Sequence, residues 1–131
     1  MMEVGQVLQS ITRTPTREQL KAYAESSRDR NPIHIDEAFA KEKAGLPSVI
    51  VHGMLSMAFL ADLLALNFPE DEWVLCRFKA RFRKVAFPDE ALRCEAVVRE
   101  VDGDGTVQVF VSAHNPAGET TTDGVAYLKR K

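Results

Sequence analysis

The sequence predicts an α+β domain in which a curved antiparallel sheet wraps around one central buried helix. Two observations support this prediction. Residues Met54 to Leu66 are apolar around almost the whole circumference of a helix, which is typical of a helix enclosed by other structure. From Val74 onward, segments of alternating polar and apolar residues follow one another between turn sequences. This is the pattern of antiparallel strands that have one face in the core.

Length and composition limit the class of protein. The chain has 131 residues, enough for its own core, and we expect residues 1–131 to form a single domain. A hydrophobic content of 45% and a net charge of −2 are typical of a globular protein, and they give no reason to expect nucleic acid as a partner. The N-terminal segment lacks a signal-peptide pattern, and the longest apolar stretch is too short to span a bilayer. We therefore expect a cytoplasmic protein that binds no membrane. Cys76 and Cys94 lack metal-site spacing, so we expect both to be reduced core residues.

The first elements are predicted from alternation and capping signals. Residues Val4 to Arg13 alternate weakly and could form a strand. Thr16, followed three residues later by Gln19, is a capping-box pattern that predicts the start of a helix. That helix should end near Arg28, because the Asn-Pro pair that follows disfavours helical backbone.

A second short helix and an extended segment are predicted next. Asp36 can cap a helix over Glu37 to Ala44, and Gly45 provides a C-terminal stop. Val49 to Val51 is expected to be extended and to lead into the apolar helix.

The second half of the chain should supply the sheet. We expect the turns at Asp102–Gly105 and Asn115–Gly118 to join its later strands. The last strand is expected over Thr120 to Lys129. The residues expected to face inward in the first three of these strands are Val74, Cys76, Phe78, Ala80 and Phe82, then Leu92, Cys94, Ala96 and Val98, then Val107, Val109, Val111 and Ala113.

Candidate chemistry lies between the first helix and the apolar helix. Asp29 and His34 are five residues apart on either side of Asn31-Pro32, and His52-Gly53 directly precedes Met54. A carboxylate, an imidazole and a helix N-terminus with free amides can move protons beside a carbonyl group. The alternative interpretation is that Asp29 caps a local turn and that His34 is an ordinary hydrogen-bonded loop residue.

Two motifs resemble those of a known family. The segment D-R-N-P-I-H-I-D, from Asp29, and the segment V-H-G-M, from Val51, resemble the D-x-N-P-x-H and H-G-M patterns of the MaoC-like (R)-specific enoyl-CoA hydratases and related acyl dehydratases. Phe78 to Glu90 also resembles the family's strand that leads into a Pro-Asp turn. The similarity extends over roughly Gln19 to Leu92. It implies a hotdog fold, in which an antiparallel sheet surrounds a central helix and pairs with a second subunit or domain.

The resemblance also implies roles for individual residues. Asp29 and His34 match the catalytic acid and base, and Gly53 matches the residue whose backbone amide holds the thioester oxygen. Asn31 and Pro32 are expected to support the loop, and His52 is expected to be structural. Ala61 departs from the family, since some members have a serine there that lines the site.

The expected function is reversible hydration of trans-2-enoyl thioesters to (R)-3-hydroxyacyl thioesters, in fatty acid metabolism. We expect no metal and no cofactor, with coenzyme A or acyl carrier protein as the carrier of the substrate. Alternatives are the catalytic subunit of a heterodimeric 3-hydroxyacyl-ACP dehydratase and a non-catalytic acyl-CoA-binding module. A thioesterase is less expected, because thioesterases of this fold place their acid on the central helix, and Asp62, the only acid there, has no accompanying match.

Partners and carrier contacts are further expectations. A sheet of this type leaves one side uncovered, so we expect a homodimer or higher homo-oligomer, with a heterodimer as the alternative. Basic side chains on the first long strand could contact coenzyme A phosphates or could form a solvated strand face. These side chains belong to Arg77, Lys79, Arg81, Arg83 and Lys84.

Overall fold

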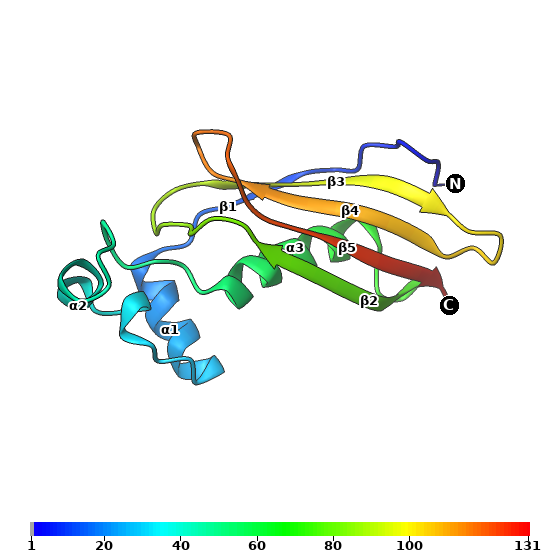
Figure 1. Ribbon diagram of the computed structural model, residues 1–131. Coiled ribbons are helices and arrows are strands. Elements are labelled where there is room, and N and C mark those ends of the chain that lie inside the picture. Colours follow the sequence, from blue (N-terminus) through cyan, green and yellow to red (C-terminus); the bar gives the residue numbers. More distant parts are fainter. Residues whose placement is uncertain (1) are drawn as a thin grey trace.

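The computed structural model describes residues 2–131, which form a five-stranded antiparallel sheet with one long helix against it (Figure 1). Two shorter helices lie at one end of the molecule, and the two chain ends lie at the other (Figure 1). In chain order the elements are β1 (Ile11–Arg13), α1 (Arg17–Ser27), the 3-10 helix η1 (Pro32–His34), α2 (Glu37–Glu42), α3 (Gly53–Asn67), β2 (Trp73–Phe82), β3 (Leu92–Val101), β4 (Val107–His114) and β5 (Thr120–Arg130).

The strand order is β1-β3-β4-β5-β2, with β1 and β2 at the two edges. The tight hairpins β3–β4 and β4–β5 contain Gly105 at φ 88° and Gly118 at φ 82°, which is left-handed backbone that glycine adopts without strain. β2 precedes this meander in the chain but pairs with its last strand, β5. The predicted α+β class, a hotdog-type sheet around a central helix, is confirmed.

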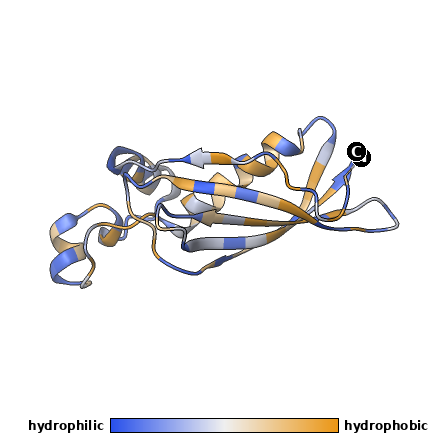
Figure 2. Ribbon diagram, turned by 90° about the horizontal axis from the view of Figure 1, so that it is seen from above, coloured by the Kyte–Doolittle hydropathy of each residue, from blue (hydrophilic) through white to orange (hydrophobic). Residues whose placement is uncertain are grey.

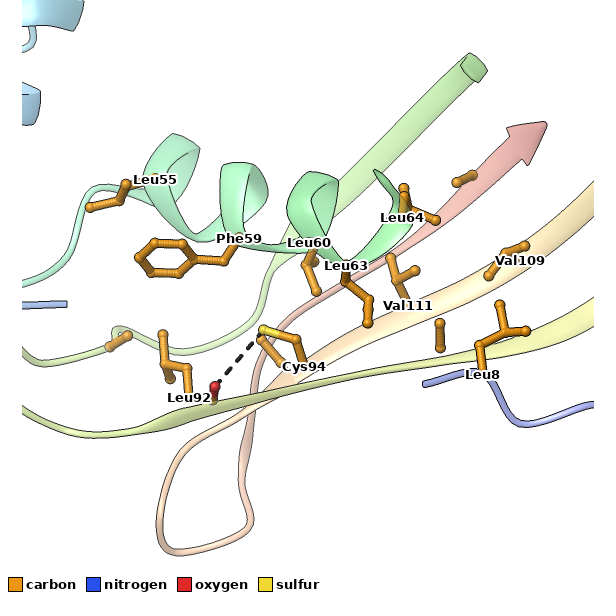
Figure 3. Close-up of a cluster of buried hydrophobic side chains, with 14 of the residues drawn as sticks. Leu8, Leu55, Phe59, Leu60, Leu63, Leu64, Leu92, Cys94, Val109 and Val111 are labelled. Carbon is orange, nitrogen blue, oxygen red and sulfur yellow. Dashed lines mark hydrogen bonds between the residues drawn. The ribbon is translucent and has the colours of Figure 1, made fainter. Parts of the chain in front are cut away.

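The core lies between α3 and the inner face of the sheet. Phe59, Leu60 and Leu63 project from α3 toward the strands that carry Cys94 and Val111 (Figure 3). The strands carry alternating hydrophilic and hydrophobic bands (Figure 2). The residues predicted to face inward from β3 and β4 are all buried, so this part of the prediction is confirmed: Leu92, Cys94, Ala96, Val98, Val107, Val109, Val111 and Ala113.

One stripe of α3 is exposed, contrary to the prediction that the helix is enclosed on all sides. Met54 is 57% exposed and Leu66 is 46% exposed, and Ala58 and Asp62 lie on the same side. The reason is geometric: within residues 2–131 the sheet covers one side of the helix. The apolar sequence predicts that a face will be covered, but not which chain covers it.

A β-bulge interrupts the strict alternation predicted for Val74 to Phe82. The pairing of β2 with β5 shifts register between Leu75 and Arg77. One extra residue in a strand reverses the direction of every side chain on one side of it. Trp73 is therefore buried and Val74 is exposed, so the predicted inward positions are wrong before the bulge. Even after it, Phe82 is 54% exposed, because the start of α3 covers only part of its ring.

The two cysteines differ in environment. Cys94 is buried, as predicted, and desolvation by burial raises the pKa of its thiol to about 11. Cys76 is exposed at the bulge, so its assignment to the core is wrong.

The N-terminal strand and helix form where the sequence predicts them, but the strand is shorter than predicted. β1 contains three residues instead of Val4 to Arg13, and Val7 makes only an isolated bridge to Val97. The side chain of Thr16 accepts a hydrogen bond from the Gln19 amide at 3.1 Å, as the capping box predicts.

α2 is also shorter than predicted. Asp36 caps it through the Phe39 amide at 3.0 Å, but the helix ends at Glu42, before the predicted Ala44. Val49 to Val51 is buried and connects to neighbouring loops, where the Val51 amide donates to the Ala86 carbonyl at 2.8 Å. Every helix among residues 2–131 is too short or too polar to cross a bilayer.

Gly124 is predicted to be essential for the pairing of β5 with β2. A methyl group at this position would lie well inside contact distance of the Lys79 carbonyl oxygen, which is backbone and cannot rotate away. We expect Gly124→Ala to lower the free energy of unfolding by about 2 kcal/mol or more in urea denaturation. The matched control is Gly103→Ala, where the added methyl group meets open space and the change should stay within about 0.5 kcal/mol. Equal effects of the two substitutions would contradict this account.

Candidate active site

Asp29 is held at the exit of α1 by local contacts. The helix ends because Arg28 adopts a left-handed conformation, with φ 64°. The Ser27 hydroxyl then accepts a hydrogen bond from the Asp29 amide at 3.2 Å, and the Asp29 carboxylate accepts a long one from the Asn31 amide at 3.4 Å. The Asp29 side chain remains 54% exposed, so the carboxylate lies at the surface on a short, well-connected loop.

His34 ends the 3-10 helix that the Asn-Pro pair begins. The Asn31 side chain caps η1 by accepting from the Ile33 amide at 3.2 Å, and Pro32 occupies the first turn. The ring of His34 is buried, with its Nδ1 2.7 Å from the carbonyl oxygen of Ile50. A carbonyl only accepts, so Nδ1 carries the proton and Nε2 has a free lone pair. A supporting role of Asn31 and Pro32 in the site stays a prediction.

The free Nε2 of His34 faces the carboxylate of Asp29. Nε2 and Oδ2 are 3.9 Å apart, which is too long for a direct hydrogen bond. Two acceptors at this separation can both be reached by one water molecule that donates to each. The structure therefore brings together the two side chains that the sequence singled out, with a separation that suits a bridging water.

His52 lies directly against His34. The two rings stack with centroids 3.8 Å apart and planes inclined by 21°, and Tyr23 meets His52 edge-on at 4.8 Å. His52 is fully buried, and its Nε2 lies 3.1 Å from the carbonyl oxygen of Asp29. Nε2 must therefore carry the proton, which leaves Nδ1 as a bare acceptor.

The bare Nδ1 of His52 is buried and has no hydrogen-bond partner among residues 2–131. An unsatisfied buried polar atom costs about 1–3 kcal/mol. Burial lowers the pKa of His52 below 6.5, the neighbouring His34 lowers it further, and the bond to the Asp29 carbonyl opposes this shift. The ring is therefore neutral near neutral pH.

Gly53 begins α3 beside these rings. The carbonyl of His52 accepts hydrogen bonds from the amides of Leu55 and Ser56, so the amides of Gly53 and Met54 precede the first bonds within the helix. Such amides, at the positive end of the helix dipole, can bind a negatively charged oxygen. A methyl group on Gly53 would lie 3.1–3.2 Å from ring atoms of Phe82, so the glycine also makes room for this ring.

His34 and Gly53 line one cavity of about 330 Å³. Three further residues in its wall, Ser56, Phe82 and Thr122, were missed by sequence reasoning. A polar residue inside an apolar helix was a usable signal for Ser56. Phe82 and Thr122 become neighbours only through the pairing of β2 with β5, which no local pattern predicts.

A metal ion does not fit the donors of this cluster. Asp29, His34 and His52 each offer one ligand atom, and these atoms lie within 4.8 Å of one another. However, the two nitrogens left free by the carbonyl bonds belong to stacked rings inclined by only 21°. The lone pair of an imidazole nitrogen lies in its ring plane, so nearly parallel planes cannot direct both lone pairs at one ion. A metal-free reaction stays a prediction that this geometry favours.

The basic residues near the cavity mouth are paired with acids. Asp123 lies 3.0 Å from Nε of Arg83 and 3.6 Å from Nε of Arg81, and Lys84 pairs with Glu119. Arg83 and Lys84 also line the cavity. Contact of these residues with carrier phosphates stays a prediction.

Comparison with known proteins gives a consistent result. The model of the MaoC like domain family matches residues 2–119. Over 69 residues the chain is 42% identical to the mitochondrial 3-hydroxyacyl-[acyl-carrier-protein] dehydratase of Arabidopsis thaliana, a match that covers 53% of this chain and 40% of that protein. The chain thus spans less than half the length of this relative.

Two bacterial relatives match over nearly the whole chain. The (R)-specific enoyl-CoA hydratase of Aeromonas caviae is 28% identical over 129 residues, which cover 98% of this chain and 95% of that protein. The unliganded R-hydratase PhaJ1 of Pseudomonas aeruginosa aligns with a TM-score of 0.89 at 29% identity, covering 98% of this chain and 82% of that structure.

The lowered pKa of His52 predicts a pH-dependent stability term. Below about pH 6.5 the unfolded state binds a proton at this residue and the folded state does not, so the free energy of unfolding falls as the pH decreases toward the folded-state pKa. His52→Phe removes this term. We expect the free energy of unfolding of the variant, minus that of the wild type, to increase as the pH is lowered from about 7.5 to about 5.5 in urea titrations. Phe59→Leu, a buried change without a titrating group, serves as the control. A His52→Phe difference that is independent of pH would contradict the prediction.

Proposed function

The chain belongs to the MaoC-like domain family, and we propose that it is a hydro-lyase that reversibly adds water to trans-2-enoyl thioesters to give (R)-3-hydroxyacyl thioesters. The observation that carries this proposal is the 3.9 Å separation of His34 Nε2 and Asp29 Oδ2, with His34 and Gly53 lining one cavity. The names of the Aeromonas and Pseudomonas relatives support the hydration direction and the (R) product.

The acid–base pair would activate one water molecule. The water donates to His34 Nε2 and to the Asp29 carboxylate, which fixes its oxygen above C3 of the bound enoyl group. As the oxygen bonds to C3, one water proton passes to the pair, and the pair returns one proton to C2. One water is added in total, and the reverse sequence is dehydration. No step needs a cofactor.

The N-terminus of α3 would stabilise the charge that this attack creates. Addition at C3 moves electrons toward the thioester oxygen, which becomes enolate-like. The amides of Gly53 and Met54, which precede the first intrahelical bonds of α3, can donate to this oxygen. Their partial positive charge is part of the helix dipole and requires no rearrangement during the reaction.

The geometry weighs against two alternative functions. A thioesterase of this fold would need its acid on the central helix, but Asp62 is 58% exposed and pairs with Arg13 at 3.6 Å. A pure binding module would need neither the free Nε2 of His34 nor a carboxylate facing it. Dehydration of 3-hydroxyacyl groups on acyl carrier protein remains the second candidate, favoured by the name of the Arabidopsis relative.

A second subunit is part of the proposal. Four exposed apolar residues lie on α3, at the end of β2 and in the segment that follows it: Met54, Leu66, Phe82 and Val85. Two residues of the cavity wall are close to this surface. Phe82 belongs to it, and Gly53 directly precedes Met54 in the chain. We propose that a second copy covers it, because leaving such a patch in water is unfavourable. A related but different chain is the alternative occupant, as in a heterodimeric dehydratase.

Substitution of the acid–base pair should abolish hydration. We expect Asp29→Asn and His34→Gln to lower kcat for crotonyl-CoA by about 10²–10⁴-fold, because each replaces a group that can take up and return a proton by an amide that cannot. Loss of enoyl absorbance provides the measurement. The matched controls Asp71→Asn and His114→Gln change the same residue types away from the cavity and should retain activity within about threefold.

Two outcomes of that experiment would count against different parts of the proposal. Absence of wild-type turnover with both short and long acyl chains, on both carriers, would refute the hydro-lyase assignment. Retained rates in the Asp29 and His34 variants would instead refute the residue roles.

The exposed stripe of α3 should control assembly. Light scattering on the purified chain is expected to give twice the monomer mass of 14.6 kDa. Leu66→Glu places a charge in the apolar stripe and should shift the protein to monomer, whereas Val4→Glu, at a 67% exposed position elsewhere, should not. A monomeric wild type would favour the heterodimer.

A further inference from the structure

The buried ring of His52 carries a polar atom that packing does not require. It is fully buried between His34 and Tyr23, and its Nδ1 has no partner among the described residues. A phenylalanine would occupy nearly the same volume without an unsatisfied polar atom. Packing alone therefore does not account for histidine at this position. The remaining polar contact of the ring is the hydrogen bond from Nε2–H to the carbonyl of Asp29 at 3.1 Å.

We propose that His52 is a positioning residue for the acid–base pair, which holds the backbone of Asp29 through Nε2–H and the plane of the His34 ring through stacking. The inference rests on the proposed hydration reaction for its catalytic readout. His52 touches neither substrate nor water in this account. It acts through the two residues on either side of the bridging water.

The Asp29 loop depends on this bond. The other hydrogen bonds that anchor residues 28–31 are local and connect residues no more than five positions apart. The bond from His52 spans 23 residues and connects the loop to the start of α3. Without it, the long-range bonds that remain join Ile33 and His34 to Ile50, and the Asn31-Pro32 turn separates these two residues from Asp29.

The ring plane of His34 depends on the stack. Its single ring hydrogen bond, from Nδ1 to Ile50 at 2.7 Å, holds one edge of the ring. A second ring 3.8 Å away and nearly parallel packs against its face and resists tilting, so the Nε2 lone pair keeps pointing toward Asp29. His52 must be neutral for this purpose, since a cation would repel the imidazolium that forms on His34. The fully buried position of His52 favours the neutral form.

Two substitutions separate the roles of the ring and of the N–H group. His52→Phe keeps a ring of similar size and loses the donor, whereas His52→Gln loses the ring and keeps a terminal N–H near the position of Nε2. We expect His52→Phe to retain or raise the melting temperature while kcat falls about 10–100-fold and KM changes less than about threefold. His52→Gln keeps the bond to the Asp29 carbonyl but loses the stack, so its kcat should also fall, through loss of the stack alone. Opposite changes in stability and kcat are not expected of a residue that only fills space.

A second measurement tests the inference without catalysis. Amide hydrogen exchange at residues 28–31 should become at least about tenfold faster in His52→Phe and should stay near wild type in His52→Gln. This result is independent of substrate, so failure of the proposed hydration reaction remains distinguishable from failure of the positioning role. Wild-type kcat in His52→Phe, or unchanged exchange in His52→Phe, would overturn the proposal.

Discussion

The packing of α3 against the inner face of the sheet is the constraint on which the site depends. Leu60 and Leu63 are fully buried in this contact, and large apolar side chains in such positions fix a helix along its length. The first residue of that helix is Gly53, and its cap is His52. The same burial therefore fixes the candidate oxyanion amides and the ring that contacts both Asp29 and His34. Residues 28–34 form their own short-range hydrogen bonds and are attached to this rigid reference by only a few longer ones.

Much of the fold was predictable because its signals are local. The alternation in β3 and β4 has period 2, and burial follows it over most of both strands, with Ser112 as a buried exception. The caps at Thr16 and Asp36 require only the residues within the next turn. The bulge in β2 was not predictable in this way, because its register shift is defined by the partner strand. Cys76 illustrates the result: its spacing from other residues matched the core, and one inserted residue moved it to the surface.

The candidate site shows the same division between local and non-local information. Asp29 and His34 were predictable because a short rigid turn joins them, and Gly53 because it follows a second recognisable motif. The wall formed by Phe82 and Thr122 results from pairing between strands that are 40 residues apart. The contact of His52 with the Asp29 carbonyl spans 23 residues. The spacing of the motifs is enough to predict the reacting groups. It does not predict the contacts between distant residues that fix the orientation of these groups.

The 3.9 Å separation of His34 Nε2 and Asp29 Oδ2 has a consequence for the choice of nucleophile. Both atoms are hydrogen-bond acceptors when the imidazole is neutral and the carboxylate is ionised. A molecule held between them must therefore donate two hydrogens from one small atom. Water can do this, whereas an alcohol or a thiol has one such hydrogen and can satisfy only one acceptor. Discrimination against cellular alcohols and thiols would then follow from hydrogen-bond valence, without any steric barrier at the mouth of the cavity.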